Sequence, residues 1–313
     1  MNNSIPEILR KQSIESLFGA DTFNTSWNLW KNKIHQILGQ NFDENKLINL
    51  GDFLSEIFQT TGNSTRSQSS LSGGGAAWES LVCWYINMCC VGSRVVAIKK
   101  MSLVPKPIQH SITVNYGNFA CNTESDITII IFPDLPEYIN DISTLSVVDS
   151  TGQAIQTLIR NKYNSIVTDV LIERDFHEMG VGIIQCKTNW NDNAQIPMLW
   201  DMIYSAGGFR GRNITIGRNN FSIQSLKQFS YSFVTVPSNN RGVYNQNSVC
   251  VKRVTNLSGG NYWGKPTVPY VAKSLKEIFV SNYITGFNSN IRHNLKNNIS
   301  EFSQNKSLSY FNL

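Results

Sequence analysis

The sequence has little charge and few of the residues that build common metal and disulfide sites. Charged residues make up 16% of its 313 residues, and its four histidines show no metal-ligand spacing. Its six cysteines form no C-x-x-C pair, which argues against a zinc site and a disulfide scaffold. No stretch approaches about 18 uncharged apolar residues, so we expect no membrane-spanning helix and no membrane partner.

The N-terminus also lacks the pattern of a targeting segment, because charged residues such as Glu7 and Arg10 interrupt its apolar positions. We therefore expect a soluble, cytoplasmic protein. The sequence is rich in side-chain amides, with 36 asparagines, and has a mild net charge of +5. That charge permits a polyanionic partner such as DNA without requiring one.

The N-terminal part of the chain is predicted to be helical, and the middle part to contain both helices and strands. Apolar residues recur at helical spacing over residues 1–60, and the Ser, Thr and Gly content of residues 61–75 predicts a flexible linker. A buried helix is expected over 76–90 because it has a broad apolar stripe, and another helix over 156–176.

Strands are expected where β-branched and aromatic residues cluster, at residues 95–98, 126–132, 181–187 and 229–236. Pro197 suits the first turn of a helix that Gly207 and Gly208 end. The order helix, strand, strand, strand, helix, strand predicts an α/β fold with a central mixed sheet flanked by helices.

Two of the expected strands bring together groups that suit a metal site. Asp126 begins one strand, and Gln185 and Lys187 end another, where positions i and i+2 share a face. If the strands are neighbours, Asp126 joins them. The Asp126 carboxylate and the Gln185 side-chain oxygen would then hold Mg²⁺, which lowers the pKa of a bound water, and Lys187 would orient that water.

This set of residues resembles the active site of the PD-(D/E)xK nuclease superfamily, and within it the type II restriction endonucleases in which Gln replaces the middle carboxylate, the QxK variant. The resemblance implies a restriction-endonuclease-like core over residues 76–236. A helical N-terminal addition and a mixed C-terminal addition, residues 237–313, would serve DNA recognition and dimerisation. The long separation of Asp126 from Gln185 requires an insertion between the two strands.

The same resemblance implies an activity and partners. The expected activity is Mg²⁺-dependent hydrolysis of phosphodiester bonds in double-stranded DNA at a short specific site. A homodimer suits a palindromic target, because each subunit then cuts one strand. The resemblance also implies a bacterial source and a companion DNA methyltransferase that protects the host DNA.

Two further carboxylates are candidates for the same site. Asp169 lies in residues 165–174, which fit either a strand or a helical face, and a strand there would make Asp169 the metal ligand in place of Asp126. Glu79 follows Trp78 on the expected helix, where many members of the superfamily supply an extra carboxylate. The simpler interpretation of Glu79 is a solvated helix residue.

Amides and basic residues are candidates for contact with DNA. The segment after Lys187 carries Asn189, Asn191, Asn193 and Gln195, which can read adenine edges or, alternatively, order a turn before the next helix. Further candidates for phosphate, guanine or base-stacking contacts are Arg210, Arg212 and Trp263.

Two other functions stay open beside the restriction endonuclease. A DNA-repair or recombination nuclease would read the shape of branched or damaged DNA. A catalytically inactive DNA-binding module would explain why Gln185 is neutral, and it would bind DNA without cutting it.

Overall fold

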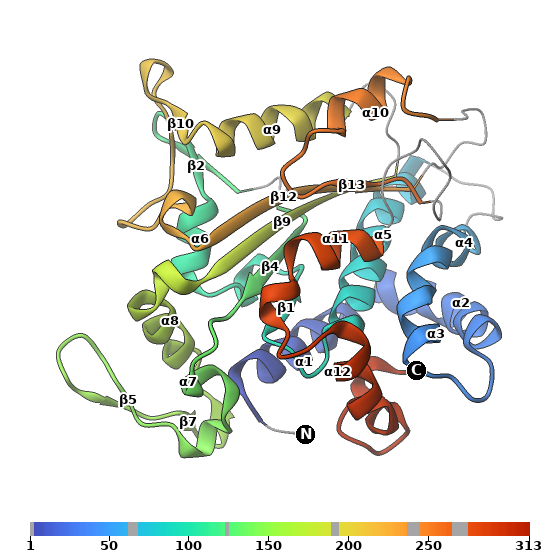
Figure 1. The fold of residues 1–313 in the computed structure, drawn as a ribbon, viewed down its shortest axis with the longest axis horizontal. Coiled ribbons are helices and arrows are strands. Elements are labelled where there is room, and N and C mark those ends of the chain that lie inside the picture. Colours follow the sequence, from blue (N-terminus) through green and yellow to red (C-terminus); the bar gives the residue numbers. More distant parts are fainter. Residues whose placement is uncertain (1–2, 62–67, 123–124, 189–193, 237–243, 265–274) are drawn as a thin grey trace.

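The protein is an α/β molecule built on a mixed central sheet, as the sequence predicts, and this sheet has five strands (Figure 1). The computed structural model describes residues 3–61, 68–122, 125–188, 194–236, 244–264 and 275–313. The strands, in sheet order, are β1 (Val95–Ile98), β4 (Ile127–Ile131), β9 (Gly180–Lys187), β12 (Gln228–Thr235) and β13 (Asn261–Tyr262). The pairs β1/β4 and β4/β9 are antiparallel, whereas β9/β12 and β12/β13 are parallel.

Helices cover both faces of this sheet, so its central strands are buried on both sides. Strand β4 is buried along its whole length, and β9 is buried up to Cys186. This explains why both strands are continuous apolar runs instead of alternating ones. The register pairs Ile127 with Ile184, which places the start of β4 beside the end of β9.

One face packs against a long helix, α5, together with N-terminal and C-terminal helices. These are α1 (Ile5–Phe18), α2 (Asp21–Leu38), α3 (Glu44–Asn49), α4 (Leu54–Gln59), α5 (Gln68–Cys89), α11 (Leu275–Asn282) and α12 (Ile291–Asn298). Their apolar residues form one cluster that includes Trp30, Trp78 and Phe311.

The opposite face packs against α6 (Lys106–Ile112), α8 (Ser165–Arg174), α9 (Gln195–Ser205) and α10 (Val249–Val254). Helix α9 begins two residues before Pro197 and ends before Gly207, close to the prediction. A short helix, α7 (Pro136–Ile139), follows β4.

Two local predictions were wrong. The helix expected to begin at residue 76 begins at Gln68, so residues 68–75 are helical instead of part of the linker. The helix expected over 156–176 is confined to Ser165–Arg174. The residues before it form short antiparallel pairs, β5 (Val147–Val148) with β6 (Ala154–Ile155), and β7 (Leu158–Ile159) with β8 (Lys162–Tyr163). These pairs and α8 form the insertion between β4 and β9.

A second sheet was not foreseen from the sequence. It contains four short strands, in the order β10 (Gly208–Phe209), β11 (Ile214–Ile216), β2 (Val114–Tyr116) and β3 (Phe119–Cys121). All three neighbouring pairs are antiparallel. It lies at the end of α9 where β10 begins (Figure 1).

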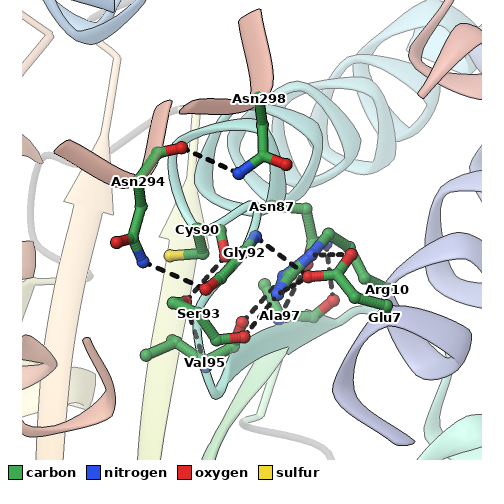
Figure 2. Close-up of polar contacts among 10 residues, drawn as sticks. All are labelled: Glu7, Arg10, Asn87, Cys90, Gly92, Ser93, Val95, Ala97, Asn294 and Asn298. Carbon is green, nitrogen blue, oxygen red and sulfur yellow. Dashed lines mark hydrogen bonds and ion pairs between the residues drawn. The ribbon is translucent and has the colours of Figure 1, made fainter. Parts of the chain in front are cut away.

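Side chains, and not another strand, satisfy the open edge of β1 (Figure 2). The buried Asn87 side chain accepts from the Ala97 amide at 3.0 Å and donates to the Ala97 carbonyl at 2.7 Å. The buried Arg10 guanidinium donates to the carbonyls of Val95 and Ser93 at 2.8 and 2.9 Å. Such pairing removes the template for aggregation that an exposed strand edge presents.

The same region joins both ends of the chain to the sheet. Glu7 pairs with Arg10 at 3.1 Å and accepts from the Gly92 amide at 2.9 Å, and Asn294 of α12 donates to the Gly92 carbonyl at 3.1 Å (Figure 2). Helices from the N-terminal and C-terminal regions therefore meet at the turn between α5 and β1. Within the described part of the chain, no helix is both long enough and apolar enough to span a bilayer.

Candidate active site

The candidate site lies at one end of the main sheet, where the ends of three neighbouring strands lie side by side. Strands β1 and β9 run in the same direction and β4 runs between them in the opposite direction. Three residues therefore gather at the same end of the sheet. They are Lys99 directly after β1, Asp126 directly before β4, and Lys187 at the end of β9. Helix α5 brings Glu79 to this end of the sheet.

The Asp126 carboxylate is oriented by β9. Its Oδ2 accepts a hydrogen bond from the Cys186 backbone amide at 2.7 Å and lies 3.8 Å from Nζ of Lys187. The Asp126 side chain is 14% exposed and that of Lys187 is 31% exposed, so solvent reaches the ion pair. The predicted neighbourhood of Asp126 and Lys187 is therefore present in the structure.

A second ion pair lies beside the first. Oε2 of Glu79 is 3.3 Å from Nζ of Lys99, and both side chains are about one-quarter exposed. Burial raises the pKa of Glu79 above its ordinary value of 4.5, and the charges of Lys99 and Lys187 act in the opposite direction. Helix α5 thus places Glu79 beside Lys99 and within the electrostatic field of Lys187.

The buried thiol of Cys186 lies within the electrostatic field of both pairs. Burial raises its pKa well above the ordinary value of a thiol, and the negative charges of Asp126 and Glu79 raise it further. Cys186 belongs to the apolar core.

Gln185 was predicted to be presented at the site together with Lys187, but the structure buries it. It is fully buried, and its Oε1 accepts a hydrogen bond from the Tyr231 hydroxyl of β12 at 3.0 Å. Only Lys187 of the predicted Gln185–Lys187 pair is accessible. The Gln185 side-chain oxygen is thus shielded from solvent, and Tyr231 occupies one of its two lone pairs.

The oxygen donors of the site fit a magnesium ion in part. Asp126 and Glu79 offer two carboxylates, and Mg²⁺ in proteins is commonly held by one or two carboxylates together with waters and substrate phosphate. Gln185, the other predicted ligand, does not fit in this arrangement. Within the described residues, no group of three or more His, Cys, Asp or Glu side chains is arranged to hold a metal.

The alternative aspartate lies elsewhere. Asp169 is on helix α8 and not on a strand, and its Oδ1 accepts from the backbone amide of Lys106, the first residue of α6, at 2.9 Å. It thus caps the N-terminus of α6. The structure places Asp126, and not Asp169, beside Lys187.

The residues predicted to contact DNA have different positions. Gln195 is exposed at the start of α9, and Arg210 and Arg212 are exposed between β10 and β11. Asn189, Asn191 and Asn193 lie outside the described residues. The prediction for Trp263 was wrong, because its ring is 1% exposed and its Nε1 donates to Asn261 at 2.9 Å.

Sequence reasoning missed two residues at the site, Lys99 and Tyr231. Lys99 directly follows the expected strand at 95–98, but its relation to Asp126 depends on strand order, which the sequence does not reveal. Tyr231 reaches Gln185 from β12 across the parallel β9/β12 pair.

No protein-family model matches the chain, and a search of curated proteins finds none that is similar to it. The functional interpretation therefore rests on the residues and their geometry.

Proposed function

We propose that the protein is a Mg²⁺-dependent endonuclease of the type II restriction class, which hydrolyses phosphodiester bonds in double-stranded DNA. One observation carries this proposal: the contact between Asp126 and Lys187 at the adjoining ends of antiparallel strands β4 and β9. The mixed sheet flanked by helices is compatible with the restriction-endonuclease-like core that the sequence resembles.

In this proposal the accessible side chains have separate roles. Asp126 and Glu79 would bind Mg²⁺, which supplies charge neutralisation and a water of lowered pKa. Lys187 would hold a phosphate oxygen and orient the attacking water. Lys99 balances the charge of Glu79. A water would attack phosphorus, and one P–O ester bond would break. The proton that this water gives up would pass to solvent, and the leaving oxygen would take up a proton from solvent.

The proposal extends to the biological setting that the resemblance implies. The protein would act as a homodimer in the bacterial cytoplasm, and a companion DNA methyltransferase would protect the host DNA. Two active sites in one dimer would cut the two strands of a palindromic target.

Gln185 favours a second candidate, a DNA-binding module without catalysis. It is neutral and its side-chain oxygen is engaged by Tyr231, so this position supplies no negative charge for a metal. In that case the charged residues at the sheet edge would contact DNA phosphates without hydrolysing them.

Incubation of the purified protein with unmethylated phage DNA tests the proposal. Discrete fragments should form with Mg²⁺, disappear with a chelator and disappear in Lys187→Ala. Intact DNA in every reaction, together with a persistent gel shift, would favour the module. Cleavage restricted to branched or damaged DNA would indicate a repair or recombination nuclease instead.

A further inference from the structure

The small four-stranded sheet lies close in sequence to both strands that carry the candidate site. Strand β3 ends at Cys121, shortly before Asp126, and α9 leads from the segment after Lys187 to β10. Helix α9 has 11 residues, which corresponds to a length of about 16 Å. That length equals about five base-pair steps of duplex DNA, at about 3.4 Å a step.

The tips of the two hairpins in this sheet lie side by side. The Gly117 amide, in the turn between β2 and β3, donates to the Asn213 carbonyl, which precedes β11, at 2.8 Å. Both tips are exposed, and each carries a phenylalanine: Phe119 is 66% exposed and Phe209 is 41% exposed.

These phenylalanines are the two ends of a row of apolar residues that crosses all four strands. The cross-strand pairs are Phe209 with Ile214, Ile214 with Tyr116, and Tyr116 with Phe119. The central residues are partly buried, and the Tyr116 ring contacts Trp200 of α9 at 6.3 Å between centroids. The row is thus anchored in the core at its centre and open to solvent at both ends.

The charge of this sheet has a single sign. Residues 114–121 and 208–221 contain three arginines, Arg210, Arg212 and Arg218, and no Asp or Glu. All three are exposed, and Nε of Arg218 donates to Asn115 of β2 at 2.8 Å. An apolar row in a sheet whose charged residues are all arginines is complementary to a polyanion with apolar base edges, which describes DNA.

We propose that this basic sheet is the surface that binds duplex DNA next to the site of cleavage, with its arginines on phosphates and with Phe119 and Phe209 in contact with base edges. The inference rests on the proposed function and specifies it further. It places the reading of DNA partly between residues 114 and 221, and not in the C-terminal region alone.

Binding of a short mixed-sequence DNA duplex in Ca²⁺, which limits cleavage, tests this proposal by fluorescence anisotropy across a series of salt concentrations. Arg210→Ala combined with Arg212→Ala should reduce the slope of log Kd against log salt by about two. Phe119→Ala combined with Phe209→Ala should weaken binding about tenfold and leave the slope unchanged.

Two exposed residues on other elements serve as matched controls. Arg292→Ala lies on α12, which Figure 1 shows at the opposite end of the molecule, and Val148→Ala lies on β5 and is 54% exposed. Both should bind DNA as the unmodified protein does.

The possible failures are distinguishable. If the unmodified protein neither binds nor cuts DNA, the proposed function is wrong. If it cuts phage DNA and all sheet variants bind like the controls, the inference alone is wrong. A change of oligomeric mass in the phenylalanine variants, with unchanged DNA binding, would also overturn the inference and identify the row as a protein interface.

Discussion

The Asp126 carboxylate, held by a backbone amide and facing Lys187, is the residue on which the account depends. The neighbouring strand fixes the orientation of this carboxylate through the Cys186 backbone amide. Lys187 lies close enough to stabilise it and is exposed enough to reach a substrate. At this scale the chemistry of the site can be tested group by group.

Glu79 predicts how the metal requirement varies with pH. A carboxyl group must be deprotonated to bind a metal. Because burial raises the pKa of Glu79, protons compete for it at a higher pH than for an ordinary glutamate. The Mg²⁺ concentration needed for half-maximal cleavage should therefore rise as pH falls toward that pKa. Glu79→Gln should need more Mg²⁺ throughout and show a flatter profile, whereas identical profiles would remove Glu79 from the metal site.

Substitution of Tyr231 tests whether Gln185 only stabilises the fold or also binds the metal. Tyr231→Phe removes the hydroxyl that Gln185 accepts from and should lower the free energy of unfolding by about 1–3 kcal/mol. If Gln185 is only structural, the Mg²⁺ requirement for cleavage should not change. Denaturant unfolding measures the first effect, and a Mg²⁺ titration of cleavage measures the second. A lower Mg²⁺ concentration for half-maximal cleavage in Tyr231→Phe would show that Gln185 binds the metal once its bond to Tyr231 is removed.

At the scale of elements, β1 depends on side chains for the hydrogen bonds of its open edge. Asn87→Ala removes both bonds to Ala97 and leaves its buried amide without this acceptor. The free energy of unfolding should fall by about 2 kcal/mol or more, because a buried unsatisfied group costs about 1–3 kcal/mol. The exposed Asn297→Ala on α12 is the control and should change stability by less than about 0.5 kcal/mol. Equal unfolding midpoints for the two variants would contradict this view of the edge.

Some strands and helices could be predicted from the sequence, and others could not. Strands at 95–98 and 181–187 were recognisable because helices cover both faces of the sheet, so that most of their residues are buried and apolar. The short strands between residues 147 and 163 were not, since each has two residues and little burial. Residues Ser165–Arg174 form a helix that packs against α6, so Asp169 lies beside α6 and not at the candidate site.

At the scale of the whole molecule, the order of strands was the information that the sequence lacked. Asp126 and Lys187 could be paired only by assuming that their strands are neighbours, and the structure supplies that adjacency. Lys99 and the four-stranded sheet were missed because both depend on which strands meet. Trp263 was misjudged because an aromatic residue within a Gly-rich segment resembles an exposed binding residue, yet its ring packs on Phe233 and Tyr244.

Asp126 is tested by the rate at which the unmodified protein, Asp126→Asn and Asp169→Asn cut unmethylated phage DNA in Mg²⁺. Thermal unfolding of each variant confirms that it is folded. We predict a loss of at least about 100-fold for Asp126→Asn and a rate close to the unmodified one for Asp169→Asn. Cleavage that survives Asp126→Asn and is abolished by Asp169→Asn would contradict the account.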